Sequence, residues 1–280
     1  MGIYHRPCNL KDALAILSTG KVTLAAGCTD LLPATERQAL AGSVLDIMAI
    51  QDLQGVTKTS QGWRIGAAAT WRDVVRADLP PAFDMLKAAA RQVGSLQIQN
   101  VATVAGNLCN ASPAADGVPP LLALDSKIEL ASSGSTRFVP LAEFVTGVRK
   151  TAMRPDEMVV AVHIPAGSGE GISAFRKLGA RKYLVISIAM VAARLVVRDG
   201  VIQSAAIAVG ACSPVAQRMG ALEAALVGRT LAGCDAAVQP AHITGVLTPI
   251  SDVRGSETYR LDAAQEQIRR VLRDLAGGVS

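Results

Sequence analysis

The chain has 280 residues, half of them hydrophobic but only 3% aromatic, so its length predicts two domains with cores built from aliphatic side chains. The net charge of +5 is dispersed, and the only local basic group, at 176–182, has a single neighbouring tyrosine, so we expect no nucleic-acid partner. The longest apolar run, 184–197, is interrupted by Ser187 and Arg194 and is too short to cross a bilayer, which excludes a membrane span.

The first predicted elements form a small β/α lobe. Asn9 and Asp12 predict the N-terminal cap of a helix over 10–19. The apolar run 22–26 and residues 44–47 predict strands on either side of a small-residue turn.

A larger lobe follows. Thr70 and Asp73 predict the cap of a helix after a strand at 63–67, and an Ala-rich helix is predicted over 81–93. The remaining elements expected in this lobe are a hairpin of strands 127–131 and 136–139, a strand at 158–164 and a linker at 167–171.

The C-terminal part has a different character. Asp199-Gly200 is the strongest hairpin signal of the chain, and it predicts strands at 191–197 and 201–209. Helical patterns follow at 217–227 and 262–275. Strands and helices grouped in this way predict an α+β architecture.

Two small-residue segments have no place in these patterns. The segment from Gln97 to Asp116 has neither a helical nor a strand period, and Thr103, Asn107 and Ser112 offer hydroxyl and amide groups suited to phosphates and polyols. The segment 24–31 follows a strand and predicts a tight turn whose N–H groups face an anion. A single segment of this kind is usually only a turn, but two on one chain favour a ligand site.

The sequence lacks the motifs of several common classes of enzyme. The sequence has no G-x-S-x-G, H-E-x-x-H, Walker or G-x-G-x-x-G motif, which disfavours hydrolase and Rossmann sites. The five cysteines are scattered and never spaced as C-x-x-C, so we expect no disulfide framework, no metal ligands and no iron–sulfur cluster on this chain. The N-terminus lacks the apolar centre of a signal peptide, and we expect a cytoplasmic protein.

The two segments together resemble the flavin loops of the FAD-binding subunit of molybdenum hydroxylases, the xanthine dehydrogenase and carbon monoxide dehydrogenase family. The family loops read A-G-G-T-D and T-I-G-G-N, the second followed by S-P-x-x-D. This chain has A-G-C-T-D at 26–30, T-V-A-G-N at 103–107 and S-P-A-A-D at 112–116. Further likeness at 65–70, 97–100 and 175–187 extends the resemblance over essentially the whole chain.

The chain also departs from the family pattern. Cys28 and Ala105 replace glycines, Gln99 replaces an arginine, and Leu184 stands where an aspartate is common. A methyl at Ala105 would crowd a pyrophosphate if that residue needs a positive φ, so we expect Ala105 rather than Cys28 to affect FAD affinity.

The resemblance implies an α+β fold. A two-lobed FAD-binding domain of the PCMH or vanillyl-alcohol-oxidase type would occupy 1–170, with lobes of about 1–56 and 57–170. A smaller C-terminal α+β domain of antiparallel strands and helices would occupy 171–280.

The resemblance also implies a cofactor site and no catalytic residue. Amides of 26–29 and 104–107 would hold the FAD pyrophosphate, Asp116 would accept hydrogen bonds from hydroxyls, and Lys177 would lie near the isoalloxazine ring. From the residues alone, Asp116 has a helix N-cap as its alternative reading, and Lys177 is equally understandable as a solvated surface lysine. The implied cofactor-binding residues are Ala25, Ala26, Gly27, Cys28, Thr29, Asp30, Leu31, Thr103, Val104, Ala105, Gly106, Asn107, Asp116 and Lys177.

The implied function is electron transfer through non-covalently bound FAD. Electrons would arrive from a small subunit with two-iron two-sulfur clusters, which takes them from a large subunit with the molybdenum cofactor, and would leave to an external acceptor. A dimer of heterotrimers is expected. Two alternatives stay open: a stand-alone flavin oxidoreductase, for which the region after Gly171 is small, and a flavin-free scaffold subunit, which Ala105 and Gln99 suggest.

Overall fold

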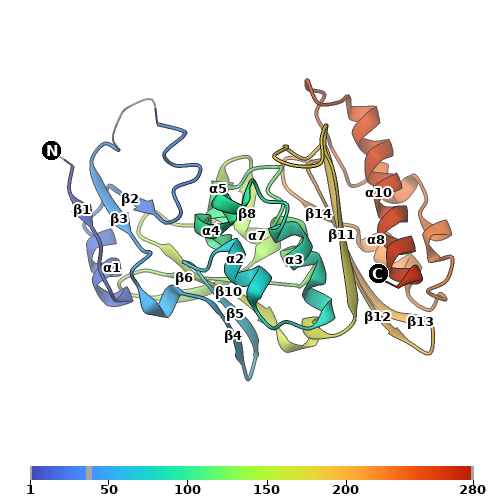
Figure 1. Ribbon diagram of the computed structural model, residues 1–280, viewed down its shortest axis with the longest axis horizontal. Helices are drawn as coiled ribbons and strands as arrows, with labels where there is room; N and C mark the ends of the chain where they lie inside the picture. The colour runs from blue at the N-terminus through green and yellow to red at the C-terminus, as the bar shows by residue number, and fades with distance from the viewer. Residues whose placement is uncertain (1, 36–39, 279–280) are drawn as a thin grey trace.

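The computed structural model describes residues 2–35 and 40–278. Three blocks follow one another along the long axis of the molecule: a small parallel sheet at the N-terminus, a central sheet with its helices, and a C-terminal sheet (Figure 1). Within the described residues, no helix is both long and apolar enough to cross a membrane.

The first block is a three-stranded parallel sheet of order β1-β3-β2. Asn9 accepts a hydrogen bond from the backbone N–H of Asp12 at 2.9 Å, which confirms the predicted cap. Ala13 and Leu17 on the same helix are buried in the core. The elements are β1 (Tyr4–His5), α1 (Leu10–Leu17), β2 (Val22–Ala25) and β3 (Ser43–Asp46).

The central block is a five-stranded antiparallel sheet of order β4-β5-β10-β6-β7, and the helices inserted between β5 and β6 lie along it (Figure 1). Thr70 and Asp73 form the predicted capping box at the start of α2. The helices, with η for 3₁₀ turns, are η1 (Gln51–Leu53), α2 (Trp71–Arg76), η2 (Pro81–Phe83), α3 (Asp84–Ala90), α4 (Leu96–Val101), α5 (Val104–Asn110), α6 (Val118–Ala123), α7 (Leu141–Phe144) and η3 (Ala166–Gly169). The strands are β4 (Val56–Thr59), β5 (Gly62–Gly66), β6 (Lys127–Ala131), β7 (Thr136–Pro140), β8 (Val145–Gly147), β9 (Lys150–Thr151) and β10 (Met158–Pro165).

The third block is an antiparallel sheet of order β11-β12-β13-β14. Its central hairpin turns at Asp199 and Gly200, whose φ angles of 51° and 73° are those of the predicted tight turn. The elements are β11 (Ile172–Leu178), β12 (Ala189–Arg198), β13 (Val201–Gly210), β14 (Gln217–Arg218), α8 (Gly220–Leu226), η4 (Cys234–Ala237), α9 (Ala241–Thr244) and α10 (Glu257–Gly277).

Both faces of this C-terminal sheet are covered. Met190 and Ala192 of β12 join the core of the central block, whereas Val191 and Ala193 join a second core with α10. Because successive side chains of a strand point to opposite faces, the sheet is packed between α3 and α6 on one side and α8 and α10 on the other (Figure 1).

The prediction that 97–116 has no regular secondary structure was wrong, because this segment contains most of α4 and all of α5. Ser95 and Thr103 cap these helices, and Thr103 Oγ1 accepts a hydrogen bond from the N–H of Gly106 at 3.0 Å. Helices of six and seven residues are too short to show a period and depend on tertiary packing. The sequence also misplaced the ends of three helices, because 81–93 comprises η2 and α3, 217–227 begins with β14, and the helix expected at 262–275 begins at Glu257.

Candidate functional site

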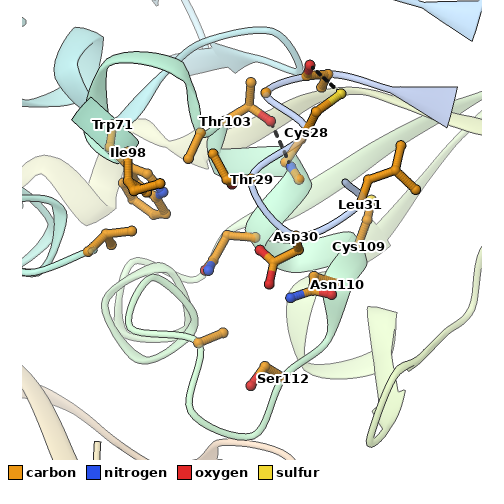
Figure 2. Close-up of a pocket in the computed structure, with 18 of the residues that line it drawn as sticks. Cys28, Thr29, Asp30, Leu31, Trp71, Ile98, Thr103, Cys109, Asn110 and Ser112 are labelled. Atoms are coloured by element: carbon orange, nitrogen blue, oxygen red, sulfur yellow. Dashed lines mark hydrogen bonds between the residues drawn. The ribbon is translucent and has the colours of Figure 1, made fainter. Parts of the chain in front are cut away.

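A cavity of about 820 Å³ lies where the blocks meet, a size typical of sites for small molecules and cofactors. It is bounded by the segment after β2, by α4 and α5, and by the connection between β11 and β12. Figure 2 shows Trp71 and Ile98 on one side of this cavity and Asp30 and Leu31 on another. The predicted site residues that line it are Ala25, Ala26, Gly27, Cys28, Thr29, Asp30, Leu31, Thr103, Ala105, Gly106, Asn107, Asp116 and Lys177.

Val104 is the predicted site residue that does not line the cavity. Its side chain is fully buried in the hydrophobic core, and its N–H donates to the carbonyl oxygen of Ala69 at 3.0 Å. The N–H groups of Gly106 and Asn107 likewise donate to Thr103. The amides of 104–107 were expected to face a pyrophosphate. In the structure most of them instead donate to other protein groups at the start of α5.

The segment after β2 keeps its amides available. The backbone N–H groups from Gly27 to Leu31 donate no hydrogen bond within the described part of the chain, and these residues line the cavity. A Cβ at Gly27 would lie 2.0 Å from the carbonyl oxygen of Val101, so this glycine lets the segment touch the end of α4. A run of free N–H groups in a concave turn is an anion-binding arrangement.

The strained position in this turn is Cys28. Its φ of 57° lies in the left-handed region, which a glycine adopts more easily, whereas Ala105 has no positive φ. The thiol donates to the carbonyl oxygen of Ala26 at 3.2 Å, and burial raises the pKa of Cys28. The expected crowding at Ala105 was therefore wrong, because that residue is helical and Cys28 carries the strain.

Asp116 and Lys177 form a buried pair between the central and C-terminal blocks. Lys177 Nζ and Ser187 Oγ donate to the two carboxylate oxygens of Asp116 at 2.6 and 2.7 Å. Burial raises the pKa of Asp116, and the Lys177 ammonium opposes that shift. The alternative of Lys177 as a surface lysine was wrong, because its side chain is only 5% exposed. The alternative of Asp116 as a helix N-cap was also wrong, because no side chain caps α6.

Sequence reasoning missed several cavity residues. Arg149 supplies a cation, and its Nη1 donates to the carbonyl oxygen of Asn110 at 3.1 Å. Leu184 and Ile186, between β11 and β12, and Ile98 of α4 add apolar walls. Ile98, Leu184 and Ile186 lie in the segments 97–100 and 175–187 that resemble the family, but only the tertiary structure shows that they line the cavity.

The cavity fits FAD in its donors and its walls. The free N–H groups of 27–31 and the Arg149 guanidinium suit phosphates, and the apolar walls suit an aromatic ring system. Two buried atoms of cavity-lining residues, Trp71 Nε1 and Asn107 Oδ1, have no hydrogen-bond partner within the described residues. Both atoms are buried from solvent, so neither adds a donor or an acceptor to the cavity wall.

Comparisons with known proteins find relatives along almost the whole chain. Residues 1–167 match the family described as FAD binding domain in molybdopterin dehydrogenase, and residues 173–275 match the CO dehydrogenase flavoprotein C-terminal domain. The xanthine dehydrogenase FAD-binding subunit of Escherichia coli O157:H7 is 31% identical, over 98% of this chain and 97% of that protein. The carbon monoxide dehydrogenase medium chain of Afipia carboxidovorans is 29% identical, over 96% and 94%.

Solved structures of related proteins have the same fold as this chain. Reconstituted CO dehydrogenase from Oligotropha carboxidovorans contains a chain that superposes with a TM-score of 0.90 at 27% identity, covering 99% of this chain and 98% of that one. In this family the FAD lies on this subunit, and partner subunits carry the iron–sulfur and molybdenum cofactors. The chain therefore belongs to the FAD-binding medium subunits of the molybdenum hydroxylases, the xanthine dehydrogenase and CO dehydrogenase family.

Proposed function

We propose that the cavity between the blocks is the FAD site of this chain and that FAD is held there without a covalent bond. The observation that carries the proposal is the run of unpaired N–H groups from Gly27 to Leu31 facing a cavity of suitable size. When bound, FAD supplies the electron-transfer chemistry, and the protein binds and orients it.

Each wall of the cavity has a distinct task in this proposal. The N–H groups of 27–31, with the Arg149 guanidinium, bind the pyrophosphate. Ile98, Leu184 and Ile186 exclude water from the ring system. The Asp116 carboxylate fixes the Lys177 ammonium at the cavity wall, where its positive charge stabilises negative charge on a neighbouring ring.

We also propose that the chain works in a dimer of heterotrimers in the cytoplasm. An iron–sulfur small subunit would deliver electrons and a molybdenum-cofactor large subunit would hold the substrate, and an external acceptor would take the electrons from FAD. The names of the relatives support the subunit assignment. All five cysteines lie in the described residues and none forms a disulfide, as suits a reducing compartment.

A stand-alone flavin oxidoreductase is not favoured. Such an enzyme needs a substrate-binding cap, and residues 173–275 instead match the C-terminal domain of CO dehydrogenase flavoproteins. A flavin-free scaffold is not favoured either, because Ala105 lies in the first turn of a helix without a positive φ, so its methyl strains no backbone there.

Substitution of an exposed cavity glycine tests the FAD site. Gly106→Val places a branched side chain at the cavity wall, and we expect it to raise the FAD dissociation constant at least about tenfold, since bulk excludes the ligand. Gly134→Val is the matched control, because that glycine lies in the distant β6–β7 turn with open space around it. Calorimetric titration of the purified apoprotein measures both constants, and acid denaturation should release all of the flavin.

The melting temperature of each apoprotein separates a folding defect from a binding defect. Equal affinities of the two variants for FAD, with both folded, would place FAD elsewhere and overturn the proposal.

A further inference from the structure

One carboxylate of the central block binds both ends of the segment that connects β11 and β12. Lys177 Nζ, near the end of β11, donates to Oδ2 of Asp116 at 2.6 Å, and Ser187 Oγ, just before β12, donates to Oδ1 at 2.7 Å. All three side chains are buried. Because Asp116 precedes α6, these two bonds join the C-terminal block to the central block.

We call residues 179–186, which lie between these two ends, the flap. Leu184, Val185 and Ile186 of the flap line the cavity, yet Leu184 and Ile186 keep 54% and 53% of their surface exposed. Apolar side chains that line a cavity and also face solvent lie at its opening. In Figure 1 the connection between β11 and β12 extends from the upper end of β11 towards the central block. The flap therefore forms a wall at the mouth of the cavity.

The hydrogen bonds of the flap itself are internal. Arg181 Nε donates to the carbonyl oxygen of Leu184 at 3.0 Å. A Cβ at Gly179 would lie 2.6 Å from Cγ1 of Val185, so this glycine lets Val185 fold back on the start of the flap. Among the residues that the structure describes, no hydrogen bond links the flap to the central block, so its polar attachment to that block is the pair of bonds to Asp116 at its two ends.

This attachment is strong because its acceptor is a buried charge. Hydrogen bonds to an ionised carboxylate are shorter and stronger than those between neutral groups. If the flap lifts, Asp116 loses the bond from Ser187 while its charge stays buried, which is an unfavourable state. Burial raises the pKa of Asp116, and the bonds from Lys177 and Ser187 oppose that shift. The carboxylate therefore favours the closed position of the flap.

We propose that Asp116 is a positioning residue that holds the flap closed through its hydrogen bond from Ser187, and that FAD enters and leaves the cavity when the flap lifts. The inference rests on the FAD site proposed above and assigns to it the segment that retains the cofactor. Bound FAD covers the apolar side chains of Leu184 and Ile186, which favours the closed flap further.

Two buried serines give a matched pair of variants. Ser187→Ala removes the bond at one end of the flap and keeps the pair of Asp116 and Lys177, and we expect FAD to dissociate about tenfold faster, the effect of one lost hydrogen bond to a charged group. Ser173→Ala is the control, because Ser173 also joins β11 to the central block but does not line the cavity. It should change the rate less than about twofold. The fluorescence of released flavin after dilution measures both rates.

The flap carries two exposed trypsin sites, Arg181 and Lys182, which give a readout that needs no bound FAD. Trypsin cuts a segment that leaves its folded position, so the rate of cleavage follows the population of the lifted flap. In the apoprotein, Ser187→Ala should be cut at these sites about tenfold faster than wild type, and Ser173→Ala should not. Mass spectrometry locates the cut, and melting temperatures show whether both variants are folded.

The wild-type protein supplies a measurement that needs no variant to fold. FAD in large excess over its dissociation constant should slow the cleavage of the flap at least about tenfold, because the lifted flap does not retain the cofactor. Unchanged cleavage in the presence of bound FAD would overturn the inference.

The remaining outcomes separate this inference from the FAD site. If the wild-type protein binds FAD but the two serine variants release it equally fast, the inference is overturned while the FAD site stands. Faster cleavage of Ser187→Ala without faster release of FAD would overturn the flap as the route of exchange. If the wild-type protein binds no FAD, the proposed function fails, and the cleavage rates of the apoproteins alone decide whether Asp116 holds the flap.

Discussion

At the scale of the residue, Cys28 carries the backbone strain of the turn after β2. A non-glycine residue in the left-handed region costs roughly 1–2 kcal/mol, and Cys28 has a φ of 57°. The turn adopts this conformation because β2, Gly27 and the end of α4 fix it on both sides. The consensus glycine of the family loop would adopt it without strain.

Cys28→Gly should therefore stabilise the apoprotein. Relief of strain exceeds the greater freedom of glycine in the unfolded chain, and we expect a gain of about 0.5–1 kcal/mol in the free energy of unfolding. Urea unfolding followed by circular dichroism measures it. Cys28→Ala is the control, because it removes the thiol but keeps the strain and should bring no gain. A loss of stability in Cys28→Gly similar to that in Cys28→Ala would show that the thiol, rather than the backbone angle, dominates this position.

At the scale of the element, the ion pair of Arg137 and Glu157 helps to hold the segment between β9 and β10. Arg137 of β7 donates from Nε and Nη2 to the two carboxylate oxygens of Glu157 at 2.6 and 2.7 Å, and from Nη2 to the carbonyl oxygen of Ala152 at 2.8 Å. Glu157 also accepts the N–H of Arg154. The pair thereby holds a segment that carries Met153, a residue of the cavity wall.

Glu157→Gln should destabilise the protein in a pH-dependent way. The hydrogen bond from Arg137 lowers the pKa of Glu157, so its stabilisation is present above the ordinary glutamate pKa and is lost as pH falls through the lowered value. We expect a loss of about 1.5–3 kcal/mol at neutral pH, the range for hydrogen bonds to charged groups.

Chemical denaturation from pH 7 down to about pH 3 measures this dependence. The difference between wild type and Glu157→Gln should shrink towards the acidic end, whereas exposed Glu143→Gln should differ little from wild type throughout. A difference that stays constant with pH would mean that the charge of Glu157 does not stabilise the fold.

At the scale of the whole molecule, the C-terminal sheet and the central block share one core, and this positions the cavity. Ser173 of β11 accepts the N–H of Met85 at 3.0 Å and donates to Pro81, and buried Arg194 of β12 donates to the carbonyl oxygen of Ala123 at 3.0 Å. Lys177 continues the same strand as Ser173. Its position at the cavity therefore depends on how the blocks pack together.

The assembly expected for this chain is testable in the native host. Gel filtration of a lysate, with metal analysis of the fraction that holds this chain, should find iron and molybdenum at the mass of a dimer of heterotrimers. The family places those centres on partner subunits, so they should elute with the FAD of this chain. A lone monomer that contains neither metal and still oxidises an organic substrate would refute the subunit assignment.

Much of this protein could be predicted from its sequence. The caps at Asn9 and Thr70 and the turn at Asp199-Gly200 are local signals, because each depends on hydrogen bonds or backbone angles within a few residues. The two small-residue segments are also local signals, because a backbone that approaches a ligand closely needs small side chains at consecutive positions. Both segments line the cavity. All predicted site residues except Val104 line the cavity.

The short helices and several features of the cavity could not be predicted, because they depend on the tertiary structure. Short helices such as α4 and α5 are stable because of packing, so their sequence shows no period. The αL conformation of Cys28, the burial of Lys177 against Asp116 and the unpaired indole N–H of Trp71 arise from contacts between residues far apart in the chain. Local composition determined which segments line the cavity, and long-range packing determined which of their side chains face it.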